Sequence, residues 1–219
     1  MAAVGTLTSR SCGSSALGGR DENQDTFFEL TEGADGSPLP CRAWGVLDGH
    51  GAHGATASRV AAECICEHLR AAFASRHPGS FTTRAVKTLL KDAFGAAHSR
   101  LVELASVQPE DVAECGTTAT VAVLLPSAKL LVCWVGDSMA IVLRPPSESA
   151  RQQRPCRATR SRKVYPEILY RLQEHTLFVE RECERVVREG GVITELSPTT
   201  RKLLPPGVPL ETIKKRRVC

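Results

Sequence analysis

Aromatic residues are scarce in this chain of 219 residues, at 5% of the sequence. The hydrophobic core must therefore be built mainly from Leu, Val, Ile and Ala. The chain also lacks any apolar run near the roughly 18 residues that cross a bilayer, so we expect no membrane partner. Apolar residues at 42% and charged residues at 24% are ordinary for a globular fold. This composition excludes a mainly disordered chain and a collagen-like one.

The nine cysteines include no CxxC pair, and no secretory hydrophobic region accompanies them. This pattern indicates reduced thiols, and we expect an intracellular protein, cytoplasmic or nuclear. The first 19 residues contain no acid, one Arg and much Ser, Ala and Gly, which is faintly similar to a transit peptide. The mitochondrial matrix is therefore the alternative location.

Aspartate is missing from the last 82 residues, because its seven copies all lie between Asp21 and Asp137. The net charge of +4 is also uneven, with −3 over residues 1–144 and +7 over residues 145–219. The basic part holds only three aromatic residues. A nucleic-acid module usually interleaves aromatic and basic side chains, so we interpret this part as a solvated linker and expect no nucleic-acid partner.

Hydrophobic periodicity predicts two strands, two helices and three further strands in that order. Apolar residues at helical spacing indicate helices from about residue 56 to 74 and from Thr83, which can cap the second one. The predicted strands cover residues 26–31, 43–47, 117–125, 129–135 and 139–143, with a hairpin signal at Gly136-Asp-Ser138 between the last two. Adjacent helices followed by consecutive strands indicate an α+β fold, with helices packed on a largely antiparallel sheet.

The last third of the chain predicts little regular structure. Residues 145–171 are rich in Pro, Arg and Ser and are interpreted as a basic insert without hydrophobic period. A third helix is expected over residues 174–189, stopped by paired glycines. Residues 194–219 are expected to be an irregular basic tail. The predicted organisation is a flexible lead-in over residues 1–12, one domain over residues 13–193, and this tail.

A carboxylate followed at once by glycine ends the apolar run at residues 43–47. At the end of a strand Asp48 can direct its oxygens to an open edge, and Gly49 adds no Cβ to obstruct the turn. Oxygen ligands of this kind suit Mg²⁺ or Mn²⁺. The same residues also suit a strand–turn–helix corner that binds nothing, and both interpretations stay open at this point.

The segment 49–54 also fits GxGxxG, the pattern of a dinucleotide-binding turn. Such a turn needs an acidic residue about 20 positions further on, at the end of a second strand. Here that position falls inside the first predicted helix, and Asp48 would repel a pyrophosphate. The dinucleotide interpretation is therefore rejected.

Four segments match one family pattern in order along the chain. They are Gly18-Gly-Arg-Asp-Glu-Asn-Gln-Asp25, Gly45-Val-Leu-Asp-Gly-His-Gly51, Cys115-Gly-Thr-Thr-Ala119 and Val135-Gly-Asp-Ser138. Together they resemble the metal-dependent protein phosphatase 2C family of serine/threonine phosphatases. The resemblance implies a β-sandwich flanked by antiparallel helices, with two Mn²⁺ or Mg²⁺ ions at one edge. It implies a phosphoserine or phosphothreonine protein as substrate, and we expect a monomer.

The resemblance also implies a role for each matching residue. Asp48 would be the carboxylate shared by both metals, and Gly49 would contribute its carbonyl. Asp25 would lie near the metal ligands, and Asp137 would be a candidate for an additional, weaker metal. Two further residues would act on the phosphate: Arg20 would bind it with its fork of donors, and His50 would give a proton to the leaving oxygen.

The chain departs from the family pattern at three places. Gln24 stands where an acid is common, and Met139 stands where Arg is common after Gly-Asp-Ser. The two later metal carboxylates of the family have no counterpart, because no Asp follows residue 137. We therefore interpret the chain as a C-terminally shortened phosphatase that hydrolyses phosphoprotein poorly or not at all.

Two finer interpretations follow from the same residues. The alternative to a shortened enzyme is a catalytically dead pseudophosphatase that binds phosphoprotein or a regulatory partner. Within the family, residues 116–123 are similar to the mitochondrial branched-chain dehydrogenase phosphatase.

Overall fold

The structure is a computed structural model that describes residues 9–17, 21–107, 115–147, 165–177, 179–191, 193–196, 201–203 and 216–218. The chain divides into two compact units. The larger unit is Met1–Ser138 with His175–Cys219, and the smaller unit is Met139–Glu174. The predicted domain bounds at residues 13 and 193 stay predictions.

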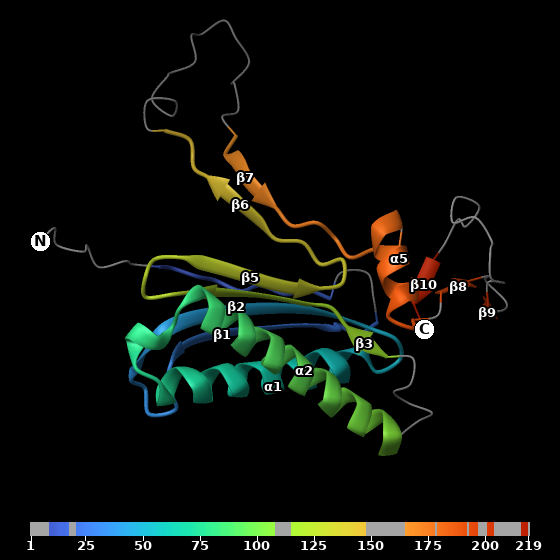
Figure 1. Cartoon of the computed structure of the whole chain (residues 1–219), viewed down its shortest axis with the longest axis horizontal. Coiled ribbons are helices and arrows are strands. Elements are labelled where there is room, and N and C mark those ends of the chain that lie inside the picture. Colours follow the sequence, from blue (N-terminus) through green and yellow to red (C-terminus); the bar gives the residue numbers. More distant parts are fainter. Residues whose placement is uncertain are drawn as a thin grey trace, which may run out of the picture. The chain divides into compact units, whose positions relative to one another are not determined.

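An antiparallel sheet of five strands is the centre of the larger unit (Figure 1). Its strands are β1 (Asp25–Glu32), β2 (Pro38–His50), β3 (Gly116–Thr117), β4 (Ala119–Leu124) and β5 (Leu130–Val135). The strand order is β1-β2-β4-β5, and β3 pairs with the end of β2. Strand β2 buries every second side chain, as a half-covered strand does.

Two long helices, α1 (Gly54–Ser75) and α2 (Thr83–Val107), cover one side of this sheet (Figure 1). The short 3₁₀ helix η1 (Pro78–Ser80) joins them. Thr82 rather than the predicted Thr83 caps α2, because its hydroxyl accepts the Ala85 N–H at 3.2 Å. The α+β fold class is confirmed.

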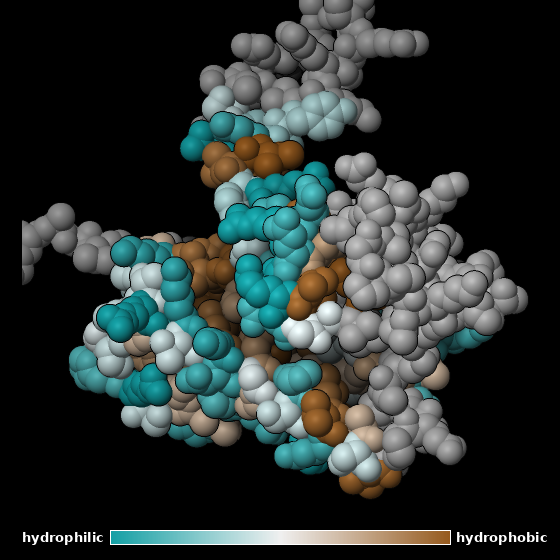
Figure 2. Space-filling view, turned by 45° about the vertical axis from the view of Figure 1, so that its right-hand side comes forward, coloured by the Kyte–Doolittle hydropathy of each residue, from teal (hydrophilic) through white to brown (hydrophobic). Residues whose placement is uncertain are grey.

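The core between the helices and the sheet is aliphatic, as the low aromatic content predicts. It contains one ring pair of the described residues, Phe73 and Phe81, packed edge to face at 5.6 Å. The other sheet face is less covered: Phe27 keeps 47% and Val46 keeps 55% of its surface exposed. Figure 2 shows hydrophobic groups open to the surface between hydrophilic ones. None of the described helices is long and apolar enough to span a membrane.

The predicted hairpin across residues 136–138 is wrong. Strand β6 (Ile141–Arg144) pairs with β7 (Glu167–Arg171), not with β5. Strand β7 lies at the end of the range 145–171, which was interpreted as a basic insert without hydrophobic period. All five of its side chains are exposed, so backbone pairing rather than burial forms this ribbon, and hydrophobic periodicity could not reveal it.

The third helix, α5 (Glu180–Arg188), is shorter than the predicted range 174–189. Before it, the His175 N–H donates to the Gly136 carbonyl at 2.9 Å, and the His175 ring stacks on Trp134 at 5.4 Å. These tertiary contacts hold the chain in a non-helical conformation, which sequence periodicity does not report.

The tail contains strands where no structure was predicted. Strands β8 (Ile193–Leu196), β9 (Arg201–Leu203) and β10 (Arg216–Val218) form an antiparallel sheet in the order β10-β8-β9. These strands have three or four residues each, and such short segments carry too little periodicity to be predicted.

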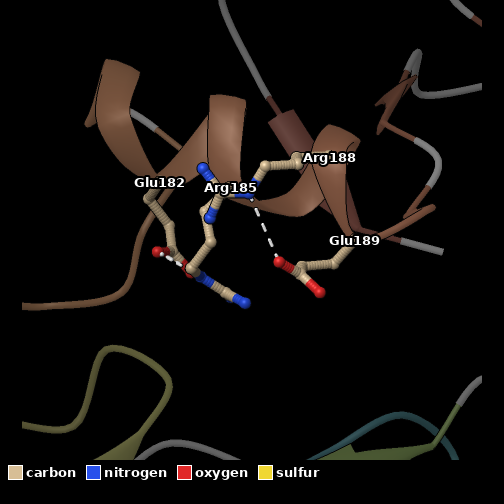
Figure 3. A network of polar contacts seen from close by, with 4 residues as sticks. All are labelled: Glu182, Arg185, Arg188 and Glu189. Atoms are coloured by element: carbon tan, nitrogen blue, oxygen red, sulfur yellow. Dashed lines mark hydrogen bonds and ion pairs between the residues drawn. The ribbon is translucent and has the colours of Figure 1, made fainter.

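Helix α5 carries a close ion pair on its polar side (Figure 3). Arg185 donates to both carboxylate oxygens of Glu182, at 2.9 and 2.6 Å, and Arg188 contacts Glu189 at 3.3 Å. The hydrogen bonds from Arg185 lower the pKa of Glu182, and His175 lowers it further. Cys183 and Val186 are the buried residues of α5.

The Glu182 pair gives a pH-dependent prediction. A carboxyl whose pKa is lowered on folding stabilises the native state above its unfolded pKa, about 4.3, and this stabilisation is lost as the pH falls through the folded pKa. We expect Arg185→Gln to raise the Glu182 pKa toward its ordinary value, as measured by NMR titration. Arg181→Gln on the same helix is the control, and an equal shift in both variants would contradict the assignment.

Burial gives a second prediction, for Cys41 on β2. Burial raises the pKa of this thiol to about 12, and the thiolate is the reactive form. At pH 8, alkylation of Cys41 should be about a thousandfold slower in the native chain than in urea, where the thiol pKa is about 8.5. The exposed Cys12 is the internal control. Equal Cys41 rates in the two conditions, read by mass spectrometry, would disprove its burial.

Candidate active site

The register of β1 on β2 places Asp25 directly opposite Asp48. Both side chains lie on the sheet face opposite the helices, because their neighbours Thr26 and Leu47 point toward the core side. Opposed residues in antiparallel strands have Cβ atoms roughly 5 Å apart, and two like charges at this distance destabilise each other. A cation between the carboxylates would offset that repulsion.

Gly49 follows Asp48 at a point where the backbone of three segments converges. Its N–H donates to the Gln24 carbonyl at 3.0 Å. A Cβ at this position would lie 2.1 Å from the Gly54 carbonyl oxygen, at the start of α1. Only glycine fits here. The expectation that a Cβ would obstruct the turn is met, because the backbone of Gly54 packs against this position.

Gln24 is held by the loop before α1 and by Ser58 near the start of that helix. Its side-chain amide donates to the Gly51 carbonyl at 2.8 Å, and its own carbonyl accepts the hydroxyl of the fully buried Ser58 at 2.7 Å. A glutamate at this position would have no N–H for the Gly51 carbonyl. The amide that departs from the family pattern therefore has a structural partner in this chain.

The backbone of Asp48 is bonded on its other side to Thr117 at the end of β3 and to Thr118, which lies between β3 and β4. The Asp48 N–H donates to the Thr118 hydroxyl at 3.0 Å. The Asp48 carbonyl accepts the Thr118 N–H at 2.9 Å and the Thr117 hydroxyl at 3.1 Å. These bonds set the place of the Asp48 side chain at the end of β2.

The other predicted site residues lie around this pair or outside the described residues. His50 follows two residues after Asp48 on the same face, opposite Gly116, with its ring so close that a Cβ on Gly116 would lie 2.8 Å from it. Asp137 is exposed in the turn after β5. Arg20 lies outside the described residues, so its predicted role stays a prediction.

The metal-ligand set of the described residues is small. No three His, Cys, Asp or Glu side chains gather into a cluster within the part of the chain that the structure describes. Asp25 and Asp48 are hard oxygen donors and fit one divalent cation between them. A second, adjacent cation would have little anionic charge to offset the repulsion between the ions.

Two hollows of about 350 and 370 Å³ lie away from these residues. Both border Arg76, just after the end of α1, whereas Asp48 is close to its start. A helix of 22 residues is about 33 Å long, so neither hollow belongs to the site. Asp25 is exposed and Asp48 is half-buried, so the carboxylate pair lies at the surface.

Comparison with known proteins places the chain in a family. The model of the protein phosphatase 2C family matches residues 12–163. The structure of serine-threonine phosphatase 2C from Toxoplasma gondii is similar with a TM-score of 0.54 and 22% identity, covering 85% of this chain and 56% of that one. The PPM Ser-Thr phosphatase MsPP from Mycobacterium smegmatis, in complex with cacodylate, has a TM-score of 0.43 and 22% identity, with coverages of 91% and 66%. No curated protein matches.

The chain belongs to the protein phosphatase 2C family, because the family model covers more than half of it. The structural likeness to the Toxoplasma enzyme supports the same fold. The chain spans 46% to 69% of the length of the similar solved phosphatases.

Sequence reasoning gave no role to three hydroxyl residues that hold the site together. They are Ser58, Thr117 and Thr118, which bond the backbone of Gln24 and Asp48. The run of β-branched residues at 117–121 predicts a strand, but it does not distinguish a hydroxyl that bonds a site residue from one that only packs.

The close packing at Gly49 gives a stability prediction. Gly49→Ala should lower the free energy of unfolding by about 1–3 kcal/mol, because the new methyl group overlaps the Gly54 carbonyl. Gly95→Ala in α2 is the matched control, since no atom lies within 4 Å of the added Cβ. That variant should raise stability by about 0.5–1 kcal/mol. Urea denaturation followed by circular dichroism measures both, and an unchanged or increased stability of Gly49→Ala would exclude the packing argument.

Proposed function

We propose that this chain is a metal-dependent protein serine/threonine phosphatase of low activity. The observation that supports the proposal most directly is the register that puts Asp25 opposite Asp48 on an open sheet face. Membership of the protein phosphatase 2C family supports phosphoprotein hydrolysis as the reaction class. Mn²⁺ or Mg²⁺ is the cofactor that suits the carboxylate donors.

Different residues of the chain would bind the cation, orient the phosphate and protonate the leaving group. Asp48 and Asp25 would hold the cation, and the Gly49 carbonyl would add a neutral oxygen ligand. The bound cation supplies an activated water and offsets the phosphate charge. Arg20 would orient the phosphate with its fork of N–H donors, and His50 would protonate the leaving serine or threonine oxygen.

The low activity follows from charge. The family site holds two cations, whereas no Asp follows Asp137 in this chain to supply the later carboxylates. Two divalent ions about 4 Å apart repel each other by several kcal/mol unless anionic ligands offset the repulsion. We propose that the residues of this chain bind one cation well and a second one poorly.

An assay with Mn²⁺ and a phosphothreonine peptide tests this proposal. We expect turnover far below about 1 s⁻¹, the low end of ordinary enzyme rates, and its loss in Asp48→Ala. Asp92→Ala, an exposed aspartate on α2, is the matched control and should change nothing. Ordinary turnover that is lost in Asp48→Ala would overturn the low-activity proposal, and turnover unchanged in Asp48→Ala would overturn the assignment of the site.

The missing carboxylates also favour a second candidate function. A pseudophosphatase would bind phosphoprotein through Arg20 and the basic insert 145–171 without hydrolysing it. Isothermal titration with Mn²⁺ separates the two candidates. Binding at or below millimolar concentration supports the phosphatase, and no binding at that concentration supports the pseudophosphatase.

We propose that this chain is a monomer and that its partner is a phosphoserine or phosphothreonine protein, which is the substrate. We propose an intracellular location, in the cytoplasm or nucleus, with the mitochondrial matrix as the alternative. The similarity of residues 116–123 to the branched-chain dehydrogenase phosphatase favours that alternative.

A further inference from the structure

The hydroxyl of Thr118 lies between the Asp48 backbone and the turn that carries Asp137. It accepts the Asp48 N–H at 3.0 Å, and it shares a hydrogen bond with the Ser138 hydroxyl at 2.6 Å. Only 9% of Thr118 is exposed. A hydroxyl group has one donor and two acceptor positions, so it can serve both partners at once.

This arrangement differs from the ordinary pairing of two strands. Thr118 lies between β3 and β4, whose registers on β2 pair Gly49 with Thr117 and Val46 with Thr120. Between these two pairs, Asp48 lies beside Thr118. The Thr118 N–H donates to the Asp48 carbonyl, as in ordinary strand pairing, but the Asp48 N–H donates to the Thr118 side-chain hydroxyl. The position of Asp48 therefore depends on one side chain as well as on the backbone.

The turn itself is supported by the same side chain. Gly136 has a φ of +93°, and a Cβ there would lie 2.7 Å from the Thr118 methyl carbon. The Ser138 carbonyl accepts the Thr120 hydroxyl at 3.2 Å. The methyl group of Thr118 fills the space under the turn, and its hydroxyl bonds the end of the turn.

We propose that Thr118 and Ser138 are positioning residues that couple Asp48 to the Asp137 turn through one pair of hydroxyl groups. Neither residue is proposed to touch a cation or substrate. The coupling itself stands on the hydrogen bonds above, and its effect on a cation at Asp48 rests on the proposed function. Movement of the turn would then change how tightly Asp48 binds a cation.

Two variants of Thr118 separate its methyl group from its hydroxyl group, and a variant of Ser138 changes the partner hydroxyl. Thr118→Val keeps the shape and removes the hydroxyl, which leaves the Asp48 N–H without this acceptor. It should weaken Mn²⁺ binding about tenfold, since a buried group that loses its partner is costly. Thr118→Ser restores the hydroxyl and should bind Mn²⁺ within about threefold of the unaltered chain. Ser138→Ala should weaken binding less than Thr118→Val.

The experiment measures two properties of the full-length chain. Mn²⁺ binding is measured by electron paramagnetic resonance, and the amide NMR shifts of Asp48 and Asp137 are measured without metal. We expect Ser138→Ala to shift the Asp48 amide and Thr118→Val to shift the Asp137 amide. The double variant Thr118→Val/Ser138→Ala should bind Mn²⁺ no more weakly than Thr118→Val alone, because both changes break the same link.

Thr82→Val is the control, since it also removes a hydroxyl that accepts a backbone N–H, at the cap of α2. It should move neither amide and should leave Mn²⁺ binding unchanged. An Asp48 amide that does not respond to Ser138→Ala would overturn the coupling, as would additive losses in the double variant. If the unaltered chain binds no Mn²⁺, the proposed function fails, and the two amide shifts alone decide on the coupling.

Discussion

The candidate site depends on the pairing of Asp48 with the strand segments on both of its sides. Asp25 lies opposite Asp48 on one side, and Thr118 bonds both backbone groups of Asp48 on the other. A one-residue shift of β2 would turn Asp48 toward the helices, and a one-residue shift of β1 would turn Asp25 there, so either shift would separate the pair. The hydrophobic side of β2, buried under α1 and α2, opposes such a shift.

The same pairing explains why small residues and hydroxyl groups gather near its ends. Gly49 and Gly54 approach too closely to allow any side chain. The Gln24 side-chain amide donates to the Gly51 carbonyl between them, and the Ser58 hydroxyl donates to the Gln24 backbone carbonyl. Buried polar groups of this kind must all find partners, because an unpaired one costs as much as a core cavity. Carboxylate placement at one edge thus depends on the packing of the α1 start.

The sequence was a good guide to the larger unit and a poor one to the rest. The helices and the strands of the central sheet were predicted because one face of each is buried, which produces a regular hydrophobic period. Strands β7 to β10 were not, because β7 is exposed along its whole length and β8 to β10 are very short. The start of α5 was misplaced because a ring stack on Trp134 is a contact between distant residues.

The candidate site was predicted in the same uneven way. The motif around Asp48 indicates oxygen ligands, and pairing with Asp25 follows once the strand register is known. The roles of Thr118 and Gln24 depend on which backbone groups come near their side chains, and no residue pattern contains that information. The hairpin signal at residues 136–138 corresponds to a real turn, but the strand after it, β6, pairs with β7 and not with β5. A turn reverses the chain without determining which strand the next segment pairs with.

The turn at Gly136 has a topological consequence. The His175 N–H bonds the Gly136 carbonyl, so the chain returns to the larger unit at the point where it left. Within the larger unit, Gly136 and His175 are therefore bonded neighbours, although the stretch Met139–Glu174 separates them along the chain. Closing so long a stretch of chain by one hydrogen bond costs conformational entropy, which the stacking of His175 on Trp134 helps to offset.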